Sequence, residues 1–561
     1  MLPEISAEER DSYVFRLYEQ LLEMEQRLIP IGLHVFGEVD QSDAAGMLQA
    51  IAAFDRPEIG VRSLPGLIAE GLGPREREEL EALVREAIEL FVADGLVPDH
   101  AAEFLARTAN VAEQESRKVF ALLGRVADGL SRNQEVDALI RALRGEYIEP
   151  GPGADIVQNP EILPTGRNTH AVNPYSIPSL GAIRKGEAVV AALLRRSLAE
   201  RGRYPETIGM VLWGMDNIKT QGEGVAQALL LMGVEPRRDA LNRVTDVNVI
   251  PLERLGRPRI DLVLTVSGIF RDLFGTSVEV LDKAARRVAA LDEPDELNFI
   301  RKHVRHEQLA GASFEDSATR VFSNAPGNYG TNVNFMVSDG QWQRAEEIGD
   351  LFIKRKCFAF GRGLDGSRSR ELMEQALSRV DLTYQNIDSA EVGITDVDHY
   401  FEYLGGMTQA VEVRSGRRPD VYLSDTLLAE PRIRSLSEMV RLETRTKTLN
   451  PKWYEGMLKH GFSGVAEIEH HVTNTFGWSA TTGAVDEWIY DEIAGRYILD
   501  SAMLQRLRSI NPYATRSLAA RLIEANGRGF WAPDAEVMDQ LHGVLGGLED
   551  QIEHAGTGAN Q

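Results

Sequence analysis

The sequence predicts a multidomain α/β protein: a helical N-terminal region, then a parallel sheet covered by helices, then a mainly helical C-terminal region. In the middle of the chain, short apolar runs of strand length alternate with helical patterns, whereas helical periodicity dominates both ends. The 561 residues, 43% hydrophobic and 26% charged, have an ordinary globular composition and are enough for about three or four domains.

Residues 1–150 form the predicted helical region. Ser6 and Glu9 fit a capping box, and the apolar residues of 14–28 keep helical spacing until Pro30. Further helical patterns cover residues 77–94, 98–109, 112–130 and 134–146. The segment 149–168 is rich in Pro and Gly, so we place a linker and a domain boundary there.

Residues 165–430 form the predicted α/β region, built of Rossmann-like or flavodoxin-like units. Strands are expected at 207–213, 247–250, 260–266 and 420–423, with a loop at 214–222 and helices at 225–232 and about 279–290. Residues 431–555 are expected to be mainly helical, and residues 556–561 to form a mobile tail.

Charge and cysteine content exclude several classes of protein. A net charge of −24 repels phosphate backbones, so we expect no nucleic-acid partner. The single cysteine, Cys357, excludes a disulfide framework and a cysteine-clustered metal site, and it suits a reducing cytoplasm. Because the apolar runs are too short to span a bilayer, we expect a cytoplasmic protein without an integral membrane segment, and peripheral contact with a membrane stays open.

Acidic residues follow three of the predicted strands: Asp216, Asp272 beside Arg271, and Asp425. In an open parallel sheet, ligands bind beyond the carboxyl ends of the strands, so these side chains are candidates for one shared crevice. The alternative for each residue is that it caps the helix that follows.

The segment Gly361–Gly366 matches the pattern GxGxxG, with an apolar run before it, a helical pattern after it, and Asp381 near the position that meets a ribose. A single motif of this kind is weak, and its charged residues fit a polar surface loop as well. The sequence contains no GxxxxGK[ST], so it carries no P-loop of its own.

Acidic residues surround His399 in the segment 391–401, which contains Glu391, Asp396 and Asp398. Carboxylates close to an imidazole are able to bind a metal or to pass protons. The alternative is an ordinary hydrogen-bonded Asp–His pair at the edge of a loop.

Other histidines carry weaker signals. His303 and His306 share a helix face, but the flanking Lys and Arg residues repel a cation, so we expect a solvated face. His470 and His471 point in different directions on a helix and are poor co-ligands.

Two segments rich in Gly and Asn, 323–334 and 474–488, are expected to be loops. Their small residues, amide donors and aromatic faces suit a flat ligand. The alternative is a pair of buried connections.

Several long motifs resemble the large (H) subunit of magnesium chelatase, in the same order, from about residue 10 to about residue 535. They are VLWGMDNIKTQGEGVAQALLLMGVEP, IPLERLGRPRIDLVLTVSGIFRDLF, RVFSNAPGNYGTNVN, YQNIDSAEVGITDVDHYFEYLGG, LNPKWYEGMLKHGFSGVAEI and NTFGWSATTGAVDEWIY. The wording DVDHYFEYLGG is most similar to the form in purple bacteria that make bacteriochlorophyll. The cobaltochelatase large subunit shares fewer of these motifs.

The resemblance implies insertion of Mg²⁺, as a substrate, into protoporphyrin IX. It implies two partners, an AAA+ motor subunit that uses ATP and a third subunit with a metal-binding domain. The family's large subunit is much longer, so the chain resembles only its C-terminal portion. Three alternatives stay open, a fragment, a naturally short form or one half of a split subunit, and the last of these implies a further chain that supplies the N-terminal half.

Residue chemistry within these motifs suggests three groups of site residues. Those expected to handle protons in catalysis are Glu391, Asp398 and His399. Those expected to hold the metal are Asp216, Asp272, Asp396 and Asp425. Those expected to contact the porphyrin are Trp213, Arg271, Lys452, Trp453 and Trp478.

Three other functions stay open at this point: a cobaltochelatase subunit, a non-catalytic porphyrin carrier or scaffold, and a nucleotide-binding protein that uses the GxGxxG segment. Porphyrin binding separates the first two from the third.

Overall fold

The computed structural model describes residues 44–558, except 55, 57–58, 73–76, 154–155, 158, 171, 362, 390 and 426–430, together with a few positions before residue 39. Most of the helix predicted at 14–28, and residues 559–561 of the predicted tail, lie outside these described residues.

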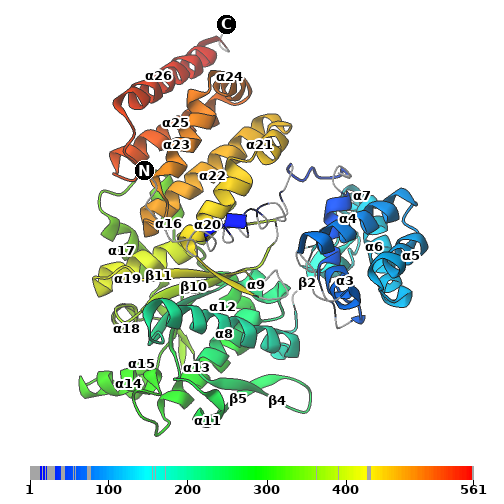
Figure 1. The fold of residues 1–561 in the computed structure, drawn as a ribbon. Coiled ribbons are helices and arrows are strands. Elements are labelled where there is room, and N and C mark those ends of the chain that lie inside the picture. The colour runs from blue at the N-terminus through cyan, green and yellow to red at the C-terminus, as the bar shows by residue number, and fades with distance from the viewer. Residues whose placement is uncertain are drawn as a thin grey trace.

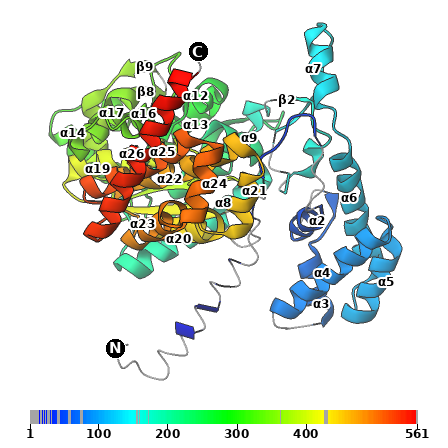
Figure 2. The same ribbon diagram turned by 90° about the horizontal axis from the view of Figure 1, so that it is seen from above.

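A group of helices forms the N-terminal part of the described chain and lies beside the main body (Figures 1 and 2). Leu64, Phe91, Leu105 and Phe120 are fully buried in its own apolar core. The helices are α2 (Ala44–Ala52), α3 (Leu64–Leu72), α4 (Arg77–Ala93), α5 (Pro98–Ala109), α6 (Glu113–Ser131) and α7 (Glu135–Leu143). The helical patterns predicted from residue 77 onward are confirmed within a few residues at each end.

The segment predicted as a linker contains two short strands, β1 (Pro150–Pro152) and β2 (Asn168–His170), which pair in parallel. The segment therefore has some backbone order between the helices and the sheet that follows.

A mixed sheet forms the centre of the main body, and among the described residues it has the strand order β12-β11-β10-β3-β6-β7-β8-β9. The five strands from β11 to β7 are parallel. At one edge β12 pairs antiparallel with β11, and at the other edge β8 pairs antiparallel with β7 and β9 pairs antiparallel with β8. The strands are β3 (Thr207–Leu212), β6 (Asp261–Val266), β7 (Val321–Ser323), β8 (Phe358–Gly361), β9 (Leu364–Arg368), β10 (Leu382–Ile387), β11 (Asp420–Asp425) and β12 (Arg432–Ser435). The α/β fold class is confirmed.

Alternating side chains of the central strands enter two different cores. Ile208, Met210 and Leu212 of β3 belong to one core, whereas Val211 belongs to the other. Since both faces are covered, β3 and β6 are buried along their whole length and are mostly apolar. The first core is covered by α8 (Leu180–Arg201), α10 (Glu223–Leu231), α13 (Gly275–Ala289) and α14 (Phe299–Leu309).

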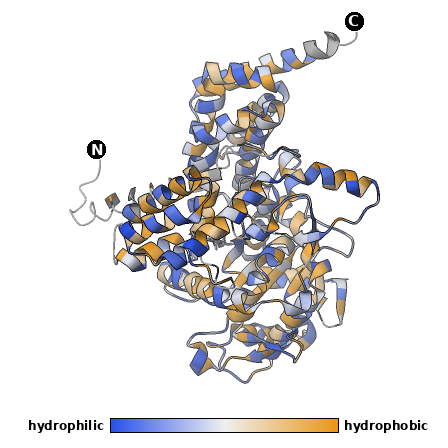
Figure 3. Cartoon of the chain, turned by 90° about the vertical axis from the view of Figure 1, so that its right-hand side faces the viewer, coloured by the Kyte–Doolittle hydropathy of each residue, from blue (hydrophilic) through white to orange (hydrophobic). Residues whose placement is uncertain are grey.

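The second core joins the sheet to the C-terminal helices, which stack on one another in Figure 1. Most helices in Figure 3 carry both hydrophobic and hydrophilic residues, as expected for helices that pack on one side. The helices on this side are α16 (Val333–Ser338), α17 (Ala345–Lys356), α18 (Arg370–Leu377), α19 (Gly406–Ser415), α20 (Leu436–Glu443), α21 (Pro451–Leu458), α22 (Gly461–Thr482), α23 (Glu487–Ala494), α24 (Ser501–Ile510), α25 (Pro512–Gly527) and α26 (Ala535–Gly558).

Shorter elements complete the described chain. The strands β4 (Val234–Arg238) and β5 (Val244–Val249) form a separate antiparallel pair, so the strand predicted at 247–250 does not join the main sheet. The short helices are α9 (Gly214–Lys219), α11 (Leu252–Leu255), α12 (Gly268–Leu273) and α15 (Phe314–Ser317), and π-helical turns cover Phe401–Gly405, Thr444–Thr448 and Gly495–Leu499. No helix of the described chain has the length and apolarity needed to cross a membrane.

The loop predictions for 214–222 and for 474–482 are wrong, and the weak dinucleotide alternative at Gly361–Gly366 is removed. The segment 214–222 contains helix α9, and Gly361–Gly366 lies at the hairpin between the antiparallel strands β8 and β9. A dinucleotide motif needs a turn from a strand into a helix, so the hairpin removes that interpretation. Residues 474–482, predicted as loop, belong to α22.

Burial and local hydrogen bonds explain why 474–482 is helical. The hydroxyls of Thr475, Thr481 and Thr482 donate to the carbonyls four residues earlier, at 2.8, 2.8 and 2.5 Å. The ring of Phe401 lies so close to Gly477 that a Cβ there would be 2.7 Å from it. Packing around these small residues overrides their weak helix propensity.

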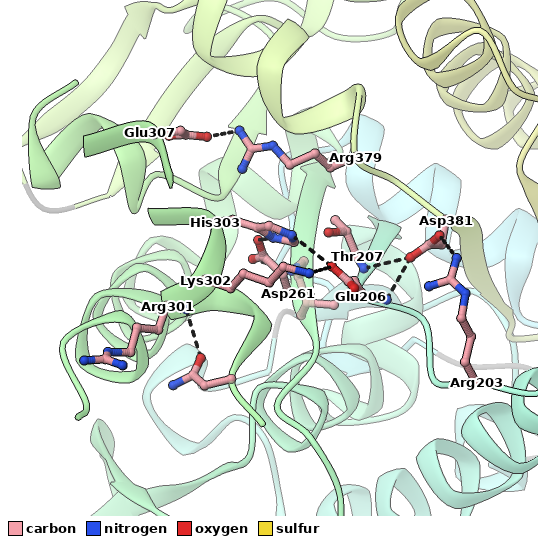
Figure 4. Close-up of polar contacts among 12 residues, drawn as sticks. Arg203, Glu206, Thr207, Asp261, Arg301, Lys302, His303, Glu307, Arg379 and Asp381 are labelled. Atoms are coloured by element: carbon pink, nitrogen blue, oxygen red, sulfur yellow. Dashed lines mark hydrogen bonds and ion pairs between the residues drawn. The ribbon is translucent and has the colours of Figure 1, made fainter. Parts of the chain in front are cut away.

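A network of ion pairs joins the amino ends of the central strands (Figure 4). Asp261, at the start of β6, accepts from Arg320 at 2.6 and 3.1 Å and contacts His303 at 2.8 Å. Asp381 accepts from the backbone N–H of Glu206 at 2.8 Å. The solvated face predicted for His303 is therefore wrong, because its imidazole is buried against Asp261.

Candidate functional site at the carboxyl edge of the sheet

The order of the parallel strands defines a switch point between β3 and β10. From β3 the chain adds β6 and β7 on one side, and then β10 and β11 on the other. The connections after β3 and β10 therefore diverge, and in open α/β sheets ligands bind at such a switch point.

Two buried carboxylates lie at this switch point. Asp216 sits on α9, directly after β3, and Asp388 directly follows β10. The ammonium of Lys219 lies 3.1 Å from Asp388 Oδ2, and the Tyr400 hydroxyl donates to Asp388 Oδ1 at 3.2 Å. Burial, and after it repulsion from Asp388 and Glu223, raises the pKa of Asp216 well above its usual value. Raised carboxyl pKa values in a cleft are typical of groups that accept or release protons.

We expect the substitution Asp216→Asn to stabilise the chain more at pH 8 than at pH 5. A carboxyl whose pKa is raised by folding costs stability as pH rises above its unfolded value, about 3.9, and an amide carries no such cost. The gain at pH 8 should be about 1 kcal/mol or more in the free energy of unfolding. Chemical denaturation at both pH values measures it.

The exposed Asp365 provides the control, because Asp365→Asn removes the same charge without a buried carboxyl. An equal gain in the two variants, or a gain for Asp216→Asn that does not depend on pH, would contradict the raised pKa.

Aromatic rings connect the loop after β3 with the segment after β10. The Trp213 ring lies 4.5 Å from the Tyr403 ring and 6.0 Å from the Tyr400 ring, measured between centroids. Trp213 Nε1 donates to Gln385 Oε1 at 3.1 Å. Lys356 Nζ lies 4.0 Å from the centre of the Tyr403 ring, and burial lowers the pKa of Lys356 well below its usual value. The half-buried Trp213 therefore presents an aromatic surface beside the buried carboxylates.

The segment 324–332, rich in Gly and Asn, connects the carboxyl end of β7 to α16 and contacts Arg271 of α12. Arg271 Nη1 donates to the carbonyls of Asn324, Ala325 and Asn328 at 2.9–3.1 Å. Asp272 accepts from Arg271 and from the Tyr329 hydroxyl, the latter at 2.6 Å. Both residues therefore order this loop, and Asp272 keeps an exposed side chain.

The acidic side chains of the segment 398–402 contact the end of that loop and the start of α16, and His399 contacts Glu402. Asp398 accepts from Asn334 Nδ2 at 2.6 Å, and the backbone N–H of Asn332 donates to the buried Glu402 at 2.9 Å. His399 Nδ1 lies 2.8 Å from Glu402 Oε2 while its side chain is 61% exposed. The hydrogen bond with Glu402 raises the pKa of His399 above its usual value. His399 is thus an exposed, strengthened base held by a buried carboxylate.

The segment before Asp398 is held by helices of the second core. Glu443 accepts from the backbone N–H groups of Ile394 and Thr395, both at 2.8 Å. Trp478 Nε1 donates to Ile394 O at 2.9 Å. Lys447 contacts Asp396 and donates to Glu391 O at 2.7 Å.

The structure brings together part of the predicted site. Trp213, Asp216, Arg271, Asp272, Glu391, Asp396, Asp398 and His399 all lie on connections at the carboxyl edge, and Asp425 is the buried last residue of β11. Trp453 and Trp478 are fully buried in the second core, and Lys452 is exposed at the start of α21. In this conformation neither tryptophan offers a face to a ligand.

Several residues at this edge were not predicted as site residues, namely Asp388, Glu402, Glu443, Lys447 and Lys356. Asp388 had only a weak signal, since the strand residues before it mix apolar side chains with Thr383, Gln385 and Asn386. Glu443 and Lys447 had none, because they reach the edge from a distant helix.

A pocket of about 490 Å³ lies elsewhere, near the amino end of β11, lined by Arg196, Arg418, Tyr422 and Gly483 among others. It is separate from the group of residues at the carboxyl edge.

The fold and the site together define a multidomain α/β protein with a carboxylate- and aromatic-rich site at a sheet switch point. The family model of CobN/Magnesium Chelatase matches residues 2–538, and the chain belongs to this family. The predicted resemblance is confirmed.

Named relatives give the same result. The chain is 41% identical to the magnesium-chelatase ChlH subunit of Oryza sativa subsp. indica, over 98% of this chain and 43% of that protein. It is 46% identical to the magnesium-chelatase H subunit of Cereibacter sphaeroides, over 76% of this chain and 36% of that protein. The solved catalytic subunit of cobaltochelatase from Mycobacterium tuberculosis matches with a TM-score of 0.92 and 32% identity, over 98% of this chain and 48% of that one. The chain therefore spans less than half the length of these relatives.

Proposed function

We propose that this chain is the porphyrin-binding C-terminal portion of a magnesium chelatase large subunit, which inserts Mg²⁺ into protoporphyrin IX. The supporting observation is the similarity to magnesium-chelatase H subunits over nearly the whole chain, at 41–46% identity. The cobaltochelatase alternative has weaker support, with 35% identity to the CobN subunit of Sinorhizobium sp. and 32% to the solved structure.

The chemistry explains why such a site needs both acids and bases. Mg²⁺ prefers oxygen ligands and gives up its waters reluctantly, so carboxylates suit a partly hydrated ion. Each insertion also releases two pyrrole N–H protons, which need acceptors near the ring. We assign proton handling to Glu391, Asp398 and His399.

The other predicted site residues complete the proposal. We assign binding of the Mg²⁺ ion to Asp216, Asp272, Asp396 and Asp425. We assign contacts with the porphyrin to Trp213, Arg271 and Lys452. Trp453 and Trp478 are buried, so they contact the porphyrin only if the second core rearranges. As the family resemblance implies, ATP is used by an AAA+ motor subunit that works with a third subunit, and the lack of a P-loop in this sequence agrees with that division.

Titration of the purified chain with protoporphyrin IX tests the proposal. We expect saturable quenching of tryptophan fluorescence, and about three- to tenfold weaker binding for Trp213→Phe, because an aromatic contact contributes about 0.5–1.5 kcal/mol. Trp488→Phe is the matched control, since Trp488 packs against Arg445 and is not part of the site.

Lack of saturable quenching, both for the chain alone and after addition of the missing N-terminal half, would overturn the proposal. Equal effects of the two tryptophan variants would remove Trp213 from the porphyrin site.

A further inference from the structure

One group of metal-ligating side chains lies outside the contacts described so far. It consists of Asp396, Glu467 and His471, each of which offers a ligand atom within 4.8 Å of the others. Asp396 comes from the segment after β10, whereas Glu467 and His471 lie four residues apart on one face of α22. Tertiary packing alone brings Asp396 to this helix.

The distances match a metal site that is partly closed. His471 Nε2 lies 2.9 Å from Asp396 Oδ1 and 3.8 Å from Glu467 Oε1. Ligands about 2.0–2.2 Å from a metal ion lie about 3 Å from each other, so the Asp–His pair has this spacing already. The Glu467 side chain is 25% exposed and has room to approach.

The imidazole of His471 is an unusual buried group. Its side chain has no exposed surface, yet neither ring nitrogen makes a hydrogen bond with any residue the structure describes. The contact with Asp396 is close, but it lacks the alignment of an N–H donor. A ring nitrogen and a carboxylate oxygen 2.9 Å apart repel each other through their lone pairs unless a proton or a cation lies between them.

Neighbouring side chains hold two of the three ligands in position. The Trp453 ring packs against the His471 ring, with centroids 4.4 Å apart. Lys447 contacts the other carboxylate oxygen of Asp396, Oδ2, and so directs Oδ1 at His471. Such supporting contacts orient the ligands of metal sites. The positive charge of the Lys447 ammonium repels a cation bound at Asp396, so we expect the site to bind its metal ion with moderate affinity.

We infer that Asp396, Glu467 and His471 bind a divalent transition-metal ion such as Co²⁺ or Zn²⁺. An imidazole with two carboxylates favours these ions over Mg²⁺, which prefers oxygen ligands alone. The site shares Asp396 with the residues assigned to Mg²⁺ under the proposed function, but it adds Glu467 and His471 and requires neither a porphyrin nor a partner protein. The separation of His470 from His471 predicted from the sequence still holds, since the site uses His471 only.

Visible absorption during Co²⁺ titration of the EDTA-treated chain tests the inference. We expect a saturable d–d band at one equivalent, removed by Zn²⁺ and retained in a hundredfold excess of Mg²⁺. His471→Gln and Glu467→Gln should each weaken Co²⁺ binding at least tenfold, and His470→Gln, which removes the adjacent exposed histidine, should leave it unchanged.

Three outcomes would overturn the inference: no saturable band for the unmodified chain, unchanged binding in Glu467→Gln, or an equal loss in His470→Gln. If circular dichroism shows that His471→Gln does not fold, Glu467→Gln decides alone, because its side chain is partly exposed. Porphyrin quenching is a separate measurement, so failure of this site and failure of the proposed function are distinguishable.

Discussion

The substitution Arg320→Met is expected to lower the free energy of unfolding by about 3–5 kcal/mol, because it leaves the Asp261 carboxylate buried without its main partner. Both side chains are only 4% exposed, and Arg320 also donates to the carbonyls of Ser317 and Thr319. The network joins β6 to the segment that leads into β7, so its loss should weaken the centre of the sheet.

The effect should depend on pH in a defined direction. Burial alone would raise the pKa of Asp261, but the charge of Arg320 and then the hydrogen bond with His303 outweigh it and lower the pKa. A lowered carboxyl pKa stabilises the fold above the unfolded value, about 3.9, and this contribution is lost as pH falls through the folded value. In Arg320→Met the carboxyl gains stability by protonation, so the difference from the unmodified chain should shrink between pH 7 and pH 4.

Urea denaturation at several pH values measures this difference. The control is Arg506→Met, which breaks the ion pair with Glu455, where both side chains are 44% exposed, and should cost less than about 1 kcal/mol. The double variant Asp261→Asn plus Arg320→Met should recover part of the loss. Equal costs for the buried and the exposed arginine would contradict the assignment.

The second large effect is expected for Glu443→Gln, which should cost about 2–4 kcal/mol, because the carboxylate is the acceptor of several buried donors. It accepts from two backbone N–H groups and from the Thr395 hydroxyl at 2.7 Å. An amide presents an NH₂ group to at least one of these donors, and a buried donor without an acceptor costs about 1–3 kcal/mol. Gly393 leaves no room for adjustment, since a Cβ there would lie 2.1 Å from Glu443 Oε1.

Hydrogen exchange gives the local measurement for this variant. The amides of Ile394 and Thr395 should exchange slowly in the unmodified chain and much faster in Glu443→Gln, whereas Glu455→Gln on the exposed face of α21 should change neither. If both amides stayed protected in Glu443→Gln, the carboxylate would not be what holds this segment. Because the same segment carries Asp396, Asp398 and His399, porphyrin and metal binding should weaken along with it.

The candidate site shows how far local sequence patterns reach. Apolar runs followed by acids placed Asp216 and Asp272 at the carboxyl edge, since the end of a parallel strand is a local property. Asp388 at the same edge was overlooked, because the strand before it contains the polar residues Thr383, Gln385 and Asn386 and does not read as an apolar run. Lys356, Glu443 and His471 reach the edge from helices that are distant in the sequence, and the spacing of nearby residues contains no information on such contacts.

The helix at 474–482 shows the opposite error, and the hairpin at Gly361–Gly366 shows why a single GxGxxG is a weak signal. Thr, Gly and Asn favour loops when exposed, but in α22 they are buried, and the hydroxyls of Thr475 and Thr481 donate to carbonyls of the preceding turn. The pattern GxGxxG describes local backbone freedom, which a hairpin uses as readily as a strand-to-helix turn.

The sequence by itself determined the α/β class, the helices from residue 77 to residue 143, the strands at 207–213, 260–266 and 420–423, and the family, because periodicity and long ordered motifs are properties of neighbouring residues. Only the tertiary structure decided that β3 and β10 are adjacent, that Asp216 and Asp388 share one buried site, and that His471 faces Asp396. These contacts depend on strand order and on helix packing, which arise from the burial of apolar surface over the whole chain.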